Sequence, residues 1–194
     1  MQNTKIQLLL NILDEVTERF DELFEFKEKL LEETNYRATH DLLTGLYNRE
    51  AFEKEVQRWI QRNTYFCLVF LDLDNFKEVN DTYGHDKGDE ILIQTAKIMR
   101  NNLKGMDLIG RIGGDEFVMA IKDCDKECAK HILDIIENDI KKHFNHFEVS
   151  ASIGGVIFPD DGEDYKELLK KADRKMYQVK ENGKGTVLVW NLKE

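Results

Sequence analysis

The first part of the chain carries a helical repeat of apolar positions. Residues 4–35 contain no glycine or proline, and apolar residues recur at alternating spacings of three and four. This pattern predicts one long helix whose seam favours a parallel coiled-coil dimer; a helix packed back onto its own domain is the alternative. Further apolar residues beside the seam imply a partner helix, a thicker bundle or contact with a globular domain. The seam runs through Ile6, Leu9, Leu13, Val16, Phe20, Leu23, Lys27, Leu30 and Thr34.

After residue 36 the heptad pattern ends and shorter elements alternate. Residues 49–62 predict an amphipathic helix, and Tyr65 to Leu71 is almost wholly apolar, which is typical of a central strand buried on both faces. Two short strands flank residues 111–117, a helix is expected over 125–144, and strands over 147–158 and 186–190. A polar loop over residues 80–89 leads into a further helix. The pattern predicts an α+β domain in which helices flank an antiparallel central sheet.

Composition restricts the function classes. The 194 residues carry a formal net charge of −10, which argues against a general nucleic-acid binder. No run of about 18 apolar residues predicts a membrane span, and the N-terminus lacks the layout of a signal peptide. The three cysteines suggest a reducing compartment, so we expect a cytoplasmic protein. Cys124 and Cys128, like His143 and His146, lack further ligands at metal-site spacing.

Adjacent carboxylates give the strongest chemical signal. Gly113 and Gly114 favour the positive φ angles of a tight hairpin, and Asp115 and Glu116 follow at once. Two neighbouring like charges are unfavourable unless a cation lies between them, so a metal-nucleotide site fits better than a plain turn. A further carboxylate, Asp72, ends the buried strand, where rigid backbone meets an open edge. Capping of the next helix by Asp72 or Asp74 is the alternative interpretation.

Residues 113–117 resemble the signature of the GGDEF family of diguanylate cyclases. Two further stretches match the family in order: His40 to Arg49 is similar to its entry motif, and residues 171–184 to its last motif, Ala-Asp-x-x-x-Tyr-x-x-Lys-x-x-Gly-Arg. The resemblance covers the chain from about Arg37 onward. It implies the palm-like fold with a βαββαβ core, a coiled-coil signalling helix over 1–36 and a catalytic domain over 37–194.

The resemblance also implies a reaction. Two GTP would be condensed into cyclic di-GMP with release of pyrophosphate, in a dimer with one GTP half-site per chain. Asp72, the carbonyl of Leu73 and Asp115 would hold Mg²⁺ or Mn²⁺. Asp115 or Glu116 would help to accept the proton, and the sequence leaves open which one.

Substrate contacts follow from the same motifs. The backbone after Asp72, with Phe76 and Lys77, would meet the phosphates as a helix N-terminus does, while Lys180 and Lys184 would grip the triphosphate. Asn80 and Asp89 would read guanine, because a carboxylate accepts from guanine N1–H and N2–H, a pair that adenine lacks. His85 is a weaker candidate for a nucleotide contact.

Two positions depart from the family pattern. Lys184 stands where the last motif has arginine, with Gly185 in place of the usual asparagine. Lys104 and Asp107 occupy the Arg-x-x-Asp inhibitory site of many relatives, and lysine lacks the planar bidentate grip of arginine. Product inhibition is therefore in doubt, and a plain loop is the alternative.

Three functions remain after this reading. The first is an active cyclase that dimerises through its N-terminal helix, with an upstream sensor domain or partner outside this chain. The second is a degenerate GGDEF module that binds GTP or cyclic di-GMP without turnover. The third is a coiled-coil adaptor with a passive domain. Asp72, Asn80, Asp89, Asp115 and Glu116 are all intact, which favours the first.

Overall fold

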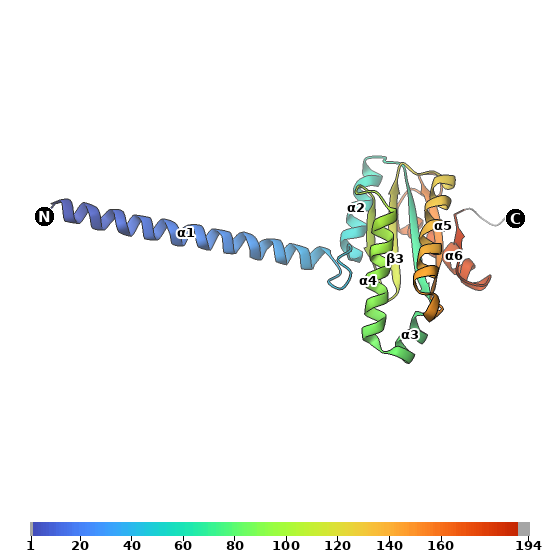
Figure 1. Cartoon of the computed structure of the whole chain (residues 1–194). Helices are drawn as coiled ribbons and strands as arrows, with labels where there is room; N and C mark the ends of the chain where they lie inside the picture. The colour runs from blue at the N-terminus through green and yellow to red at the C-terminus, as the bar shows by residue number, and fades with distance from the viewer. Residues whose placement is uncertain (1, 190–194) are drawn as a thin grey trace. The chain divides into compact units, whose positions relative to one another are not determined.

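The structure is a computed structural model that describes residues 2–189. The chain divides into two compact units, and the boundary lies between Ala38 and Thr39. The first unit is essentially one helix, α1 (Gln2–Thr39), which confirms the long N-terminal helix (Figure 1). None of the helices within residues 2–189 is both long enough and apolar enough to cross a bilayer.

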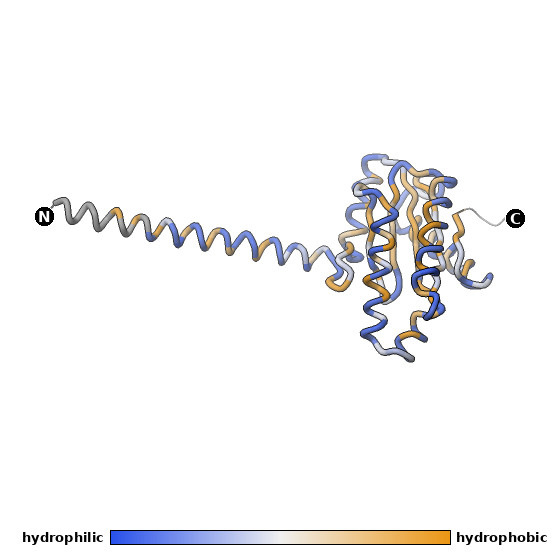
Figure 2. Tube along the Cα trace, in the orientation of Figure 1, coloured by the Kyte–Doolittle hydropathy of each residue, from blue (hydrophilic) through white to orange (hydrophobic). Residues whose placement is uncertain are grey.

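The apolar seam of α1 is uncovered in the single chain. Leu13, Val16, Phe20, Leu23 and Leu30 are between 52% and 66% exposed. Figure 2 shows these apolar positions recurring among hydrophilic ones along the helix. The seam positions Ile6 and Leu9 lie outside the residues whose side chains are described. So much regularly spaced apolar surface is typical of a helix that pairs with another.

The second unit is built on a five-stranded sheet with the order β2-β3-β1-β4-β5. Its strands are β1 (Phe66–Asp74), β2 (Leu108–Arg111), β3 (Glu116–Lys122), β4 (Ser150–Phe158) and β5 (Val187–Leu188). The α+β fold and the central antiparallel strands are confirmed, but β5 runs parallel to β4, so the sheet is mixed. The strand expected over 147–158 starts at Ser150, because a 3-10 turn (Asn145–Phe147) and a left-handed Glu148 precede it. Trp190, expected in the last strand, lies outside the described residues.

Helices cover both faces of the sheet. On one face lie α4 (His85–Asn102) and α5 (Lys126–His143), side by side in Figure 1, with α3 (Phe76–Tyr83) packed against α4. On the other face lie α2 (Arg49–Gln61) and α6 (Tyr165–Glu181). The stretch expected as a polar loop over 80–89 is helical except for a break at Gly84, whose φ of 87° ends α3 and starts α4. Gly84 therefore replaces the expected loop with a sharp helix–helix corner.

The central strand β1 is buried along its whole length, as its apolar run predicts. Its side chains alternate between the two cores: Val69 and Leu71 face α4 and α5, whereas Leu68 and Phe70 face α2 and α6. The same alternation turns Asp72 and Asp74, near the end of the strand, toward the α6 face. The carboxylates at the end of β1 are therefore directed by the strand and not by a loop.

Strand β4 and helix α6 approach each other unusually closely at Gly154. A Cβ added there would lie 2.2 Å from the carbonyl oxygen of Ala172 and 2.4 Å from the backbone nitrogen of Met176. The neighbouring Gly155 has ordinary space, since its added Cβ would come no closer than 3.4 Å to any atom. Only Gly154 is therefore required by the packing of backbone against backbone.

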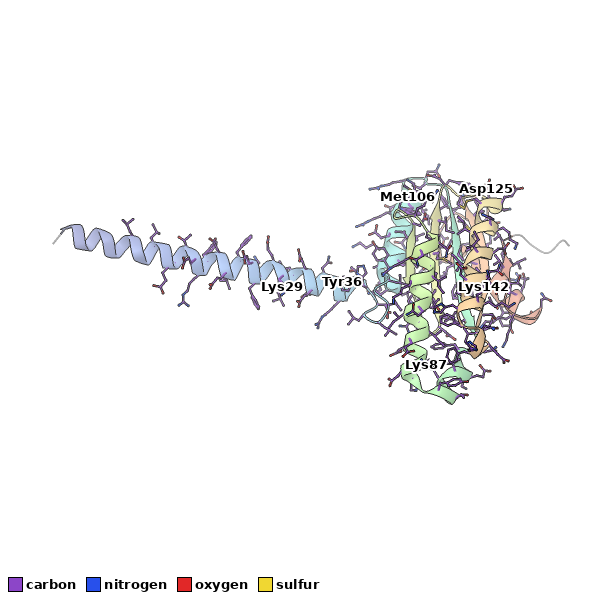
Figure 3. The ribbon with its side chains drawn as sticks, in the orientation of Figure 1. Lys29, Tyr36, Lys87, Met106, Asp125 and Lys142 are labelled. Carbon is purple, nitrogen blue, oxygen red and sulfur yellow. A yellow bond between two sulfur atoms is a disulfide. The ribbon has the colours of Figure 1, made fainter. Side chains whose placement is uncertain are left out.

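Cys124 and Cys128 are joined in a disulfide, with their Cα atoms 5.5 Å apart. The cysteine content suggested a reducing compartment, and this bond was not expected from the sequence. The separation lies within the range that disulfides span, because Cys124 stands just before α5 and Cys128 lies in its first turn. Asp125 lies between them in the sequence, and Figure 3 labels it at the end of the domain opposite Lys87. The remaining cysteine, Cys67, is buried and free, as a small core residue should be.

Candidate active site

The carboxylates singled out from the sequence meet at one end of β1 and β3. Asp72 and Glu116 are direct partners across the antiparallel ladder, so both side chains leave the sheet on the α6 face. Asp115 immediately precedes this rung, and its carbonyl oxygen accepts a hydrogen bond from the Leu73 N–H at 3.3 Å. The strand end and the hairpin therefore converge, as the metal hypothesis requires. Neither Asp72 nor Asp74 caps α3, because Asn75 is its N-cap residue.

The backbone next to these carboxylates leaves one oxygen available. In an antiparallel ladder the N–H and C=O of a residue point to the same side, so the Leu73 carbonyl faces β3. Within residues 2–189, no return hydrogen bond from the Asp115 N–H to this carbonyl forms. Two carboxylates and one carbonyl are the hard oxygen donors that Mg²⁺ prefers, and Mg²⁺ usually keeps further places for water and substrate phosphate. The donor set thus fits magnesium.

A complete protein cage for a metal is not present in the described part of the chain. No group of three or more His, Cys, Asp and Glu side chains there is arranged to hold an ion. This is compatible with a cation that binds together with a nucleotide, since phosphate oxygens then supply the missing ligands.

Asp72 is held in an unfavourable environment for its charge. It is 8% exposed, and burial raises its pKa to about 6. Lys180 of α6 opposes this shift by donating from Nζ to Asp72 Oδ1 at 2.5 Å, while the carboxylates of Asp115 and Asp74 add to it. A nearby cation would stabilise the ionised form of such a buried carboxylate.

The raised pKa predicts a specific pH dependence of stability in the metal-free protein. Between the ordinary value of 3.8 and about 6 the folded state keeps a proton on Asp72 that the unfolded chain has lost. The free energy of unfolding therefore falls as the pH rises through this window, and it recovers below it. In Asp72→Asn this loss is absent, so its stability relative to wild type should improve by on the order of 1–3 kcal/mol between pH 4 and pH 7. Urea unfolding of both proteins in chelator measures the difference; a difference that does not vary with pH contradicts the assignment.

The signature turn differs from the expected hairpin in one respect. Gly113 and Gly114 do not adopt positive φ angles, so the turn does not need glycine for that reason. A Cβ on Gly113 would instead lie 2.1 Å from Glu116 Oε2, whereas one on Gly114 would meet nothing within 4 Å. Gly113 makes room for the Glu116 carboxylate, and Gly114 leaves open space above the turn. This is the close approach that a phosphate or ribose needs.

Arg111 organises the same turn and was not singled out from the sequence. Its Nε and Nη2 donate to the carbonyl oxygen of Gly114 at 3.1 and 2.8 Å, and its Nη1 pairs with Asp41 at 3.1 Å. Asp41 in turn accepts from Thr44, and these partners lower its pKa although burial works in the opposite direction. The entry motif over residues 40–49 therefore supports the signature turn, which gives a physical reason for its structural role. An arginine two residues before the signature was the available signal.

The residues expected to hold phosphates lie around the start of α3. Asn75 precedes this helix in a left-handed conformation and makes no side-chain cap, so the first N–H groups of α3 remain available to an anion. Lys184 Nζ donates to Asn75 Oδ1 at 2.9 Å, and Lys180 is bound to Asp72. Lys77 is exposed and Phe76 is buried. Both lysines of the last motif therefore reach the end of β1.

The residues expected to read guanine lie at the α3–α4 corner. Asn80 of α3 packs against Gly88 of α4, where an added Cβ would be 2.0 Å from Asn80 Oδ1. The next residue, Asp89, is exposed, and His85 is exposed at the first position of α4. The structure thus places the Asn80 amide beside the turn of α4 that carries Asp89.

Lys104 and Asp107 form a local turn. Asp107 accepts from the backbone N–H of Lys104 at 2.8 Å and of Lys122 at 3.0 Å, so its carboxylate joins the turn to β3. Lys104 itself is exposed. These bonds support the plain-loop interpretation, because both oxygens of Asp107 already have partners.

The fold is an α+β domain in which carboxylates and a backbone carbonyl of suitable chemistry for a divalent cation lie at one end of the central strand. The family model described as "Diguanylate cyclase, GGDEF domain" matches residues 38–186. The chain therefore belongs to the GGDEF family.

Similar proteins agree with this membership. The probable diguanylate cyclase DgcE of Escherichia coli is 37% identical over an alignment of 171 residues, and the match covers 84% of this chain and 16% of DgcE. The bifunctional diguanylate cyclase/cyclic di-GMP phosphodiesterase MucR of Pseudomonas aeruginosa is 38% identical over an alignment of 155 residues, and the match covers 76% of this chain and 23% of MucR. The chain thus spans less than a quarter of either relative.

A solved structure resembles both units of the chain. The coiled coil and GGDEF domain of DgcB from Caulobacter crescentus, in complex with c-di-GMP, matches with a TM-score of 0.79 at 26% identity. The match covers 94% of this chain and 99% of that one.

Proposed function

We propose that this chain is a diguanylate cyclase that condenses two GTP into cyclic di-GMP and two pyrophosphates. The observation that carries the proposal is the convergence of Asp72, Asp115 and Glu116 at one strand end, with the Leu73 carbonyl beside them. Mg²⁺ bound at Asp72, Leu73 and Asp115 would neutralise phosphate charge and lower the pKa of the attacking 3′-hydroxyl.

The chain's own residues supply binding and proton transfer in this proposal. The first turn of α3, with Phe76 and Lys77, meets the phosphates. Lys180 leaves Asp72 to bind the triphosphate, and Lys184 leaves Asn75 to bind it as well. Asp115 or Glu116 accepts the proton of the 3′-hydroxyl. Guanine is read by Asn80 and Asp89 at the α3–α4 corner, with His85 nearby.

The product requires two copies of the chain. One chain holds one GTP, whereas cyclic di-GMP joins two, so we propose a homodimer in which two half-sites face each other. The exposed seam of α1 brings the two domains together at an effective concentration in the millimolar range. In this arrangement residues 1–36 form the signalling helix and 37–194 the catalytic domain, and an upstream sensor or partner acts through the helix.

Incubation of the purified chain with GTP and Mg²⁺, followed by chromatography of the products, tests the activity. Cyclic di-GMP supports the proposal. Binding of GTP without product in a demonstrated dimer favours the degenerate regulatory module instead, and the substitution of Lys184 for arginine is the feature that keeps this second function in view. Failure to bind GTP excludes the cyclase, and failure to bind either GTP or cyclic di-GMP excludes the regulatory module as well.

Breaking the helix seam should separate dimerisation from chemistry. Leu23→Glu places a charge in the seam and is expected to reduce turnover at least about tenfold at low micromolar protein, with partial recovery as the concentration rises. The matched control is Glu25→Gln, which lies on the opposite side of the heptad from the seam. Sedimentation and turnover are measured on the same samples. Equal specific activity of both variants at every concentration would contradict a role for the seam.

A cytoplasmic location also belongs to this proposal. The Cys124–Cys128 disulfide argues against it, because disulfides are rare in reducing compartments. In the cytoplasm we expect this pair to be reduced, and titration of thiols in freshly prepared protein distinguishes the two states.

A further inference from the structure

We propose that Asp74 is a positioning residue that holds the Lys184 loop at the triphosphate end of the site. The inference rests on the proposed function in that GTP is taken as the ligand. Asp74 lies two residues after Asp72 on the same face of β1, but its contacts differ completely from those of a metal ligand.

Both carboxylate oxygens of Asp74 accept hydrogen bonds from other groups of the protein. It is 2% exposed. Its Oδ2 accepts from Ser150 Oγ at 2.7 Å and from the Gly185 N–H at 3.0 Å, and its Oδ1 accepts from Ser152 Oγ at 2.8 Å. Asp74 thus connects the end of β1 to β4 and, through Gly185, to the loop after α6.

The loop that carries Lys184 has an unfavourable backbone. Gly183, Lys184 and Gly185 have φ angles of 120°, 64° and 59°, three positive values in succession. A left-handed backbone is unfavourable for lysine, so the loop needs contacts that hold it in place. The Lys184 N–H donates to the Val179 carbonyl at 3.2 Å, and the next N–H, that of Gly185, donates to Asp74.

The side chain of Lys184 is anchored by Asn75, the residue that follows Asp74. Its Nζ donates to Asn75 Oδ1, while Asn75 Nδ2 donates to the Glu148 carbonyl at 2.8 Å. Asp74 therefore holds the backbone of the loop and Asn75 aims its ammonium group. A hydrogen bond to a buried carboxylate is among the stronger ones, so the Asp74–Gly185 bond is well suited to fix the loop.

Glycine at position 185, where the family motif has asparagine, is compatible with this anchor. A Cβ at Gly185 would lie 3.0 Å from Ser150 Oγ, which is itself bound to Asp74. Glycine adopts the left-handed angle freely and avoids this crowding. The backbone N–H, and not a side chain, makes the contact to Asp74.

Nucleotide binding tests the proposal. Asp74→Ala is expected to weaken GTP binding on the order of tenfold, the loss of about one such bond, and to leave binding of guanosine monophosphate within about twofold. Lys184→Ala should have the same profile, and the double variant should be no weaker than Lys184→Ala alone, because Asp74 acts through Lys184. Equal losses for both nucleotides, or effects that add, overturn the proposal. The control is Asp161→Ala, which removes another carboxylate that accepts a backbone N–H, from Ile157 at the far end of β4.

Hydrogen exchange provides a readout that does not depend on GTP. Peptides covering residues 183–186 should exchange faster in Asp74→Ala than in wild type, and should be unchanged in Asp161→Ala. Unchanged exchange in Asp74→Ala overturns the proposal even if GTP binds. Faster exchange together with no GTP binding by wild type would support the Asp74 anchor while rejecting the proposed function.

Discussion

Replacing Asp115 with asparagine is expected to reduce cyclic di-GMP formation on the order of a thousandfold or more, while the domain stays folded. The side chain is isosteric, but it removes one of the two carboxylate charges proposed to hold Mg²⁺ under the triphosphate, and such charge stabilisation contributes several kcal/mol to catalysis. The backbone carbonyl of Asp115 still accepts from Leu73, so the strand end should keep its geometry. Product is measured by chromatography at saturating GTP and Mg²⁺.

The matched control is Asp123→Asn at the other end of β3. Asp123 is exposed and has a φ of 51°, a left-handed angle that asparagine tolerates well. It should keep wild-type turnover. Turnover above about a tenth of wild type in Asp115→Asn would show that the metal assignment is wrong. Equal thermal midpoints of the two variants establish that the loss is chemical.

Gly154→Ala is expected to give the largest loss of stability from a single methyl group in this domain. The added carbon would stand within 2.4 Å of backbone atoms of Ala172 and Met176, and neither can rotate away as a side chain could. Helix α6 would have to move off β4, which also shifts Lys180 away from Asp72. We expect a cost of about 3 kcal/mol or more and a fall in the thermal midpoint of about 6–12 °C.

The neighbouring glycine provides the control for this effect. Gly155→Ala adds the same methyl group to the same strand on the opposite face, where the closest atoms are 3.4 Å away. Its thermal midpoint should stay within a few degrees of wild type, since an ordinary packing contact costs little. If both variants unfold at similar temperatures, the close approach of α6 to β4 is not what Gly154 provides.

Much of the site could be predicted from the sequence because motif order and strand pattern agree. The apolar run of β1 predicts a buried central strand. Because side chains alternate along a strand, this also determines which carboxylates point to the same face. Asp72 and Asp115 were expected to converge, and Asp115 directly precedes Glu116, the residue that pairs with Asp72 across the ladder. The long N-terminal helix and the α+β fold were likewise confirmed.

Other features depend on contacts between segments far apart in the sequence, and no local pattern reveals them. The buried Lys175 looks like one more polar residue of α6, yet its Nζ donates to the carbonyls of Gly155 and Val189. Gly113 was read as a turn glycine, whereas its purpose is to admit the Glu116 carboxylate. Asp74 was considered only as a helix cap and Asn75 was given no role, because their partners, at residues 148–152 and 184–185, are supplied by distant elements.

The order of strands in the sheet has a consequence for synthesis. The central strand β1 leaves the ribosome before either of its neighbours, since β3 follows only after two helices and β4 after a third. During that interval the nascent chain carries a strand that is apolar on both faces and has no partner on either edge. Such segments aggregate readily, so production of this domain should depend on chaperones that shield β1 until β4 has emerged.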